Sequence, residues 1–221
     1  MSDSIKAFDK VAGSYDSWYA DAKGRQVFDA ERRAVEMFLP EVGLGLEIGA
    51  GTGVFAESLT DTSRPILCLD VSKEMLTKAK ERDVPTILGS AQSLPLRGGS
   101  ISFAYMITSV EFLTDPRRAF EEVNTVLRAD FPLVVLFINR SSAWGELYKR
   151  MGEKGDPVFS HARLYSEGEM IDMLTSSGLR VSGKVGTLTS GPSDASEGSE
   201  ITEPDTRTGV IVVRAVKTKI S

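Results

Sequence analysis

The sequence contains few of the residues that bind metals or form disulfides. Its 221 residues include one cysteine, Cys68, and one histidine, His161. A single cysteine excludes an internal disulfide, and without Cys–His clusters at ligand spacing we expect no metal site. Because Cys68 lies in the apolar run from Ile66 to Leu69, we expect a buried, hydrophobic cysteine in a reducing compartment.

Long apolar runs and an excess of positive charge are also missing. No apolar run approaches the roughly 18 residues that a membrane-spanning helix needs. The N-terminal residues 1–6 lack the basic and apolar blocks of a signal peptide, so we expect a cytoplasmic protein that does not bind a membrane. The net charge is −5, whereas nucleic-acid-binding surfaces are normally basic, which argues against nucleic acid as a partner.

Apolar runs alternate with helical patterns along most of the chain, and 41% of the residues are hydrophobic. This alternation is typical of a parallel sheet with helices on both faces. The expected strands are 44–48, 66–70, 86–88, 101–107, 133–138, 180–188 and 209–216. The expected helices are 25–39, 54–59, 73–82, 116–127, 142–151 and 166–177.

The most informative segment is Leu46 to Gly53, where an apolar run ends in three glycines at every second position. The run predicts a strand and 54–59 predicts a helix, so the glycines form a tight turn that lets a ligand approach the backbone. Seventeen residues after Gly53, a second apolar run ends in Asp70. A carboxylate at this position in a doubly wound sheet can bind a ribose diol. The two features together indicate a nucleoside-bearing cofactor.

The spacing of the glycines argues against a dinucleotide. The pyrophosphate fingerprint requires a third glycine three positions after the second, and this chain has Val54 there. Glu47 lies two positions before the first glycine. Its carboxylate would repel a pyrophosphate but suits an ammonium or a sulfonium group.

On these residues the chain resembles the class I S-adenosylmethionine (SAM)-dependent methyltransferases. The resemblance covers 7–178 and includes three further segments in the family's order, 69–76, 89–96 and 114–116. In that family the last two strands form an antiparallel hairpin at the sheet edge. The resemblance implies a doubly wound, Rossmann-like α/β fold with a mostly parallel seven-stranded sheet, an antiparallel last strand and helices on both faces.

We expect a single methyltransferase domain over 1–221. It would consist of an N-terminal helical cap or lid (1–40), a cofactor-binding half (41–140), and substrate-side helices with a final hairpin (141–221). The connection 189–208 has Ile201 as its one large apolar residue, so we expect a mobile surface loop there.

Each part of the cofactor has candidate partners in the sequence. The turn 49–53 can receive the methionine carboxylate on backbone N–H groups, and Glu47 can hold the ammonium through water. Asp70 can accept both ribose hydroxyls, and Val71 and Met75 can enclose the adenine, although Met75 could equally be a core residue. By resemblance, Ser90, Ala91 and Gln92 would line the adenine edge. The complete candidate set, including Tyr15 from the aromatic cap, is Tyr15, Glu47, Gly49, Ala50, Gly51, Gly53, Asp70, Val71, Met75, Ser90, Ala91, Gln92 and Thr108.

The acceptor side is less specific. By resemblance, the segment around His161 lies over the acceptor pocket, so His161 is a candidate base, with an ordinary loop histidine as the alternative. The motif Asn/Asp-Pro-Pro-Tyr, found in enzymes that methylate amino groups of nucleobases or proteins, is replaced by 108–112. The closest likeness is therefore to enzymes that methylate small molecules. The chain departs from the family pattern at Ser90, Ser102 and 128–132.

Three interpretations follow. The first is a SAM-dependent methyltransferase that acts on a small organic molecule. The second is a SAM-binding protein without catalysis, such as a partner subunit. The third is an NAD(P)-dependent oxidoreductase, which Val54, Glu47 and the lack of a Tyr-x-x-x-Lys pair disfavour.

Overall fold

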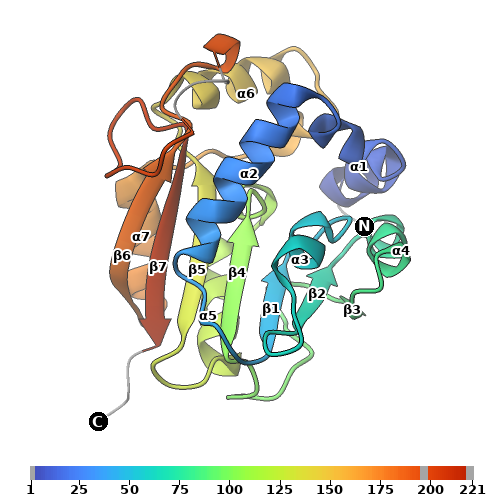
Figure 1. The fold of residues 1–221 in the computed structure, drawn as a ribbon, viewed down its shortest axis with the longest axis vertical. Helices are drawn as coiled ribbons and strands as arrows, with labels where there is room; N and C mark the ends of the chain where they lie inside the picture. The colour runs from blue at the N-terminus through green and yellow to red at the C-terminus, as the bar shows by residue number, and fades with distance from the viewer. Residues whose placement is uncertain (1–2, 195–198, 218–221) are drawn as a thin grey trace.

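The computed structural model describes residues 3–194 and 199–217. A seven-stranded sheet in the order β3-β2-β1-β4-β5-β7-β6 forms its centre (Figure 1). The strands are β1 (Gly45–Ile48), β2 (Ile66–Asp70), β3 (Thr86–Leu88), β4 (Phe103–Ile107), β5 (Pro132–Ile138), β6 (Leu179–Thr187) and β7 (Val210–Lys217). The strands pair in parallel except at β7, which is antiparallel to both β5 and β6. The predicted fold class is confirmed.

Helices cover both faces of this sheet. They are α1 (Asp3–Val11), α2 (Ala22–Glu36), α3 (Val54–Leu59), α4 (Lys73–Glu81), α5 (Pro116–Val126), α6 (Ala143–Glu153) and α7 (Glu167–Ser176). Side chains alternate along each strand, so Phe103 and Tyr105 pack in a core with α2, α3 and α6, while Ala104 and Met106 pack with α5 and α7. The predicted caps also form: the side chains of Ser72 and Asp115 accept backbone N–H groups at the starts of α4 and α5.

The N-terminal segment forms two elements, α1 and a 3₁₀ helix, η1 (Tyr15–Tyr19). Figure 1 shows α1 next to α4, near the upper ends of β1 and β2. Two short hydrogen bonds hold the segment there, each 2.6 Å long: the Ser72 hydroxyl donates to Asp9, and the Thr52 hydroxyl donates to Asp16. Asp16 also forms an ion pair with Arg82. The N-terminal segment, whose aromatic residues lie mainly in η1, is therefore hydrogen-bonded to the loops that follow β1 and β2.

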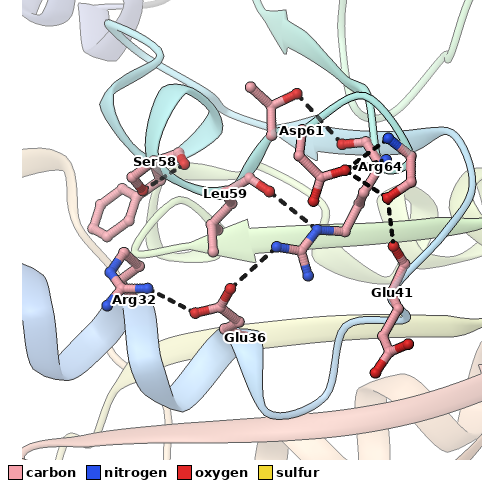
Figure 2. Close-up of polar contacts among 10 residues, drawn as sticks. Arg32, Glu36, Glu41, Ser58, Leu59, Asp61 and Arg64 are labelled. Atoms are coloured by element: carbon pink, nitrogen blue, oxygen red, sulfur yellow. Dashed lines mark hydrogen bonds and ion pairs between the residues drawn. The ribbon is translucent and has the colours of Figure 1, made fainter.

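A buried arginine ties the end of α2 to the loop before β2 (Figure 2). Arg64 is 9% exposed, and its guanidinium donates to the Leu59 carbonyl at 3.0 Å and to the Glu36 carboxylate at 3.1 Å. The second oxygen of Glu36 accepts from Arg32 at 2.6 Å. Asp61 shapes the loop by accepting the backbone N–H of Arg64 at 2.8 Å. This cluster fixes α2 against the sheet.

The connection 189–208 is attached to the fold over much of its described length. The Trp144 indole donates to the Ser190 carbonyl at 2.9 Å, and Gly186 pairs with Thr202 by an isolated β-bridge. Ile201 packs against the core. A buried indole and a sheet edge both need hydrogen-bond partners, and these parts of the connection supply them. The expected mobility of the connection stays a prediction. Residues 195–198 lie outside the described part of the chain.

Candidate active site

A cavity opens where β1, β2 and β4 end. Its floor is formed by the glycine turn and the ends of these strands, and its roof by α1 and η1. Eight of the residues proposed from the sequence line it, namely Tyr15, Gly49, Gly51, Asp70, Val71, Met75, Ala91 and Thr108. In open α/β sheets, ligands bind at this edge.

Two glycines of the turn are required for different reasons. Gly49 and Gly51 have positive φ angles of 71° and 55°. A Cβ atom on Gly49 would lie 2.5 Å from the Ser109 Cβ, so packing within the protein excludes a side chain there. A Cβ atom on Gly51 would meet only the Met75 sulfur, at 4.0 Å. The missing side chain of Gly51 therefore leaves room in the cavity itself.

Several backbone N–H groups of the turn donate hydrogen bonds to other groups of the protein. Those of Gly49 and Ala50 donate to the Leu69 carbonyl at 2.8 and 3.1 Å, and that of Gly53 donates to the Ala50 carbonyl. That of Gly51 donates to Asp70 at 2.8 Å. The N–H groups of Gly49, Ala50 and Gly51 hold the turn against β2, whereas that of Gly53 closes the turn itself. Binding of the methionine carboxylate by these donors stays a prediction.

Asp70 connects the ends of β1 and β2. Its Oδ2 accepts the Gly51 N–H and its Oδ1 accepts the Ser72 N–H, both at 2.8 Å. Burial raises the pKa of Asp70, and the backbone N–H groups oppose this shift. Since each carboxylate oxygen has two lone pairs, both oxygens keep acceptor capacity toward the cavity.

Glu47 lies outside this cavity. On β1 it stands beside Cys68 of β2 and Tyr105 of β4, on the face opposite Ile48. Its carboxylate accepts the Tyr105 hydroxyl at 3.1 Å, and burial raises its pKa to about 8. The contact with an ammonium group stays a prediction that requires a bridging water.

The residues proposed for the adenine edge divide into two groups. Val71 and Ala91 line the cavity, with 41% of Val71 exposed. Ser90 and Gln92 build the neighbouring turn instead: the Ser90 hydroxyl accepts the Gln92 N–H at 3.2 Å, and the Gln92 side chain accepts the Thr114 hydroxyl at 2.7 Å. Their polar groups are thus engaged in shaping the loop.

A second cavity of about 250 Å³ adjoins the first. Phe8, Tyr15, Thr108 and Phe112 line both. The wall of the second cavity is rich in aromatic side chains and includes one buried carboxylate, Glu31. Thr108 has a positive φ of 43°, an uncommon conformation that is concentrated at functional sites.

The comparisons with known proteins agree with this geometry. Residues 46–134 match a protein-family model described as a methyltransferase domain. The crystal structure of a SAM-dependent methyltransferase from Thermotoga maritima, described as a possible histamine N-methyltransferase, is 31% identical with a TM-score of 0.87. The match covers 97% of this chain and 100% of that one. This chain belongs to the class I SAM-dependent methyltransferase family.

Two curated relatives also match this methyltransferase over most of the described chain. A protein of Methanocaldococcus jannaschii is 30% identical over 176 residues, which cover 80% of this chain and 82% of the relative. An uncharacterized methyltransferase of Mycobacterium bovis is 30% identical over 158 residues, which cover 69% of this chain and 61% of the relative.

S-adenosylmethionine is the cofactor of this chain, as its family and its structural neighbour imply. Among the described residues, no helix is both long and apolar enough to span a membrane.

The residues predicted from the sequence do not include all of those that line the site, and one predicted residue, His161, lies outside it. Ile5 and Phe8 of α1 line the first cavity, and their spacing of three within a helical stretch was a usable signal. His161 is exposed in the 3₁₀ helix η3 (Phe159–His161) and lines neither cavity. The structure therefore does not bring the candidate base to the methyltransferase site.

Proposed function

We propose that this methyltransferase transfers the methyl group of SAM to a small organic molecule bound in the second cavity. The observation that carries the proposal is the shared wall: Phe8, Tyr15, Thr108 and Phe112 border both cavities. A ligand in the first cavity and a ligand in the second would therefore approach each other at these four residues. A volume of about 250 Å³ suits a small acceptor.

The cofactor would lie in the first cavity, held by residues from several elements. Asp70 would accept the ribose hydroxyls, while Val71, Met75 and Ala91 would contact the adenine. Gly51 would allow the methionine part to approach closely, since its Cβ position is open. The bound cofactor supplies an electrophilic methyl group on a sulfonium.

The methionine carboxylate would contact the Tyr15 hydroxyl. Tyr15 lines both cavities. Burial, then the negative charges of Glu31 and Asp70, raise its pKa to about 12, so the hydroxyl keeps its proton at neutral pH and can donate it in a hydrogen bond.

The protein's part in the reaction would be alignment and exclusion of water. Methyl transfer is an in-line displacement, so the rate depends on holding the acceptor atom against the methyl group. Phe8 and Phe112 stack edge to face, with ring centroids 4.9 Å apart, and would border the junction where the two ligands meet. An apolar junction of this kind keeps water from the reacting groups.

The test is methyl transfer from radiolabelled SAM to a mixture of small metabolites, combined with thermal shift measurements. We expect S-adenosylhomocysteine and SAM to raise the melting temperature, NAD to leave it unchanged, and label to appear in a low-molecular-weight product. Binding of SAM without transfer to any small molecule would contradict the proposal. Stabilisation by NAD alone would contradict the cofactor assignment.

A further inference from the structure

Glu31 is a buried carboxylate that lines the second cavity. It lies on α2 and is 5% exposed. Within the described part of the chain, no hydrogen bond or ion pair reaches its side-chain carboxylate. The pKa of Glu31 is raised to about 8, mainly because its side chain is buried and further because the negative charge of Glu111 lies nearby. A buried carboxylate without a partner is costly, and native proteins rarely keep one without a purpose.

Glu111 is a second buried acid near Glu31. It lies in the 3₁₀ helix η2 (Val110–Phe112), directly after β4, and its exposed fraction is 0%. Its Oε1 accepts the Ile138 N–H at 2.8 Å, while its Oε2 has no partner among the described residues. Burial raises its pKa to about 7. Two elements far apart in the sequence thus bring two incompletely bonded carboxyls to one place.

Among the described residues, the wall of the second cavity offers no positive charge to neutralise Glu31. In the described part of the chain, no lysine, arginine or histidine lines it. The other acid in the wall, Asp156, is already bonded to the N–H groups of Val158 and Phe159 at 2.9 Å. Aromatic rings, including Tyr148 stacked on Phe159 at 4.3 Å, fill much of the remaining surface. Such faces attract cations.

We propose that the methyl acceptor is an amine that enters the second cavity as an ammonium ion and is bound by Glu31. This inference rests on the proposed function, because it names the substrate class of the same site. The ammonium would form a charge-assisted hydrogen bond with the Glu31 carboxylate, and the aromatic wall would contact its apolar part. The negative charge of Glu111 would add attraction from the side of β4.

Glu31 would also take a proton before transfer. An ammonium nitrogen has no free lone pair, so one N–H proton first moves to the carboxylate, leaving a neutral amine beside a neutral Glu31. The nitrogen then forms a bond to the methyl carbon as the carbon–sulfur bond breaks and its electron pair stays on sulfur. The positive charge passes from sulfur to the methylated nitrogen, and Glu31 afterwards releases its proton to water.

The test compares two probes of almost identical shape, 2-phenylethylamine and 2-phenylethanol. Their affinities are measured by calorimetry at pH 8 with saturating S-adenosylhomocysteine, for the full chain and for Glu31→Gln. We expect the amine to bind about 10- to 100-fold more tightly than the alcohol, as a charged hydrogen bond would give. Glu31→Gln should remove most of this preference while affinity for the alcohol and for S-adenosylhomocysteine stays within about twofold.

Asp29→Asn is the matched control, because it makes the same change on the exposed side of α2. It should keep the amine preference. Equal affinity of the unmodified protein for both probes, or an amine preference that survives Glu31→Gln, would overturn the inference. Transfer of label to a hydroxyl but never to an amine would overturn it and leave the proposed function standing. Selective amine binding without transfer to any acceptor would overturn the proposed function and leave the cation site in place.

Discussion

At the residue scale, Asp70 has two tasks that one carboxylate can perform together. Its oxygens hold the glycine turn through Gly51 and the start of α4 through Ser72. Asp70 also lines the first cavity, where the cofactor's ribose would bind to acceptor capacity that the two N–H groups leave free. Binding affinity and the geometry of the turn should therefore depend on the same side chain.

Replacing this carboxylate should weaken cofactor binding. For Asp70→Ala we expect a loss of about 1.5–3 kcal/mol in SAM affinity, because two hydroxyls lose a charged acceptor. Calorimetry with SAM measures the change. Asp172→Asn, which removes a charge on the exposed side of α7, is the control. Unchanged affinity in Asp70→Ala would show that the ribose does not bind there.

Gly51 and Gly49 should respond differently to a new side chain. Gly51→Val should reduce affinity for S-adenosylhomocysteine by more than about tenfold, while the protein still folds at a cost of about 1–2 kcal/mol for the positive φ. Gly49→Val should lower the melting temperature far more, since its Cβ would lie 2.5 Å from Ser109. Calorimetry and thermal melts separate the two effects. Normal ligand binding by Gly51→Val would mean that this glycine serves the turn alone.

Sequence could identify which loops form the site but not which way each side chain points. The position of Glu47 follows from a family pattern, whereas its orientation toward Tyr105 follows from the alternation of β1 side chains in a sheet with two buried faces. The Ser90 hydroxyl accepts the Gln92 N–H, and the Gln92 side chain accepts the Thr114 hydroxyl, within a turn whose shape no periodicity encodes. The position of the His161 side chain depends on the path of the connection between α6 and α7, and tertiary packing determines that path.

At the scale of elements, the N-terminal segment should become ordered when ligands bind. Residues 8–25 rest on the cofactor loops through a few polar contacts, including Asp16 with Thr52 and Arg82. We expect their hydrogen exchange to slow markedly on adding S-adenosylhomocysteine, and Asp16→Asn to speed exchange at 15–19 in the free protein. Mass spectrometry resolves these peptides. Equal protection with and without ligand would make the segment a fixed part of the core.

The tie between α2 and the loop before β2 should contribute measurably to stability. Arg64→Met leaves the Leu59 carbonyl and one oxygen of Glu36 without their donor, so we expect a loss of about 1–3 kcal/mol in the free energy of unfolding. Urea denaturation measures it. Arg180→Met on the exposed side of β6 should change stability by less than about 0.5 kcal/mol. Similar values for the two variants would contradict the role of this cluster.

The strands and main helices could be predicted because apolar periodicity is local. The fully buried run Leu133 to Ile138 reads as a central strand, and β5 does lie inside the sheet. The attachment of the connection 189–208 could not be predicted in this way. Its contacts, such as the Trp144 indole with the Ser190 carbonyl, join residues 46 positions apart in a polar stretch with no pattern of its own.

At the scale of the whole molecule, buried acids should make stability depend on pH in an unusual direction. Burial raises the pKa of Glu31 and Glu47 to about 8 and that of Glu111 to about 7, from an ordinary value of 4.5. The folded protein therefore binds more protons than the unfolded chain between about pH 5 and 8. Stability from these groups is fully present below pH 4.5 and is lost as the pH rises through 7 to 8.

We expect the melting temperature of the ligand-free protein to fall between pH 5.5 and 8.5, by about 2–4 °C for each kcal/mol of stability lost in a chain of this size. Glu31→Gln should flatten this dependence, because the amide does not ionise. Differential scanning calorimetry across the range provides the measurement. A melting temperature that rises with pH would show that these carboxyls are ionised in the fold.

The wall shared by the two cavities has a thermodynamic consequence. Phe8, Tyr15, Thr108 and Phe112 border both, so a ligand on either side restrains the surface that the other must meet. If the cofactor strengthens acceptor binding by some factor, the acceptor must strengthen cofactor binding by that same factor. Loss of the methyl group removes the positive charge from sulfur beside this wall. The coupling free energy between the two products therefore differs from that between the two substrates.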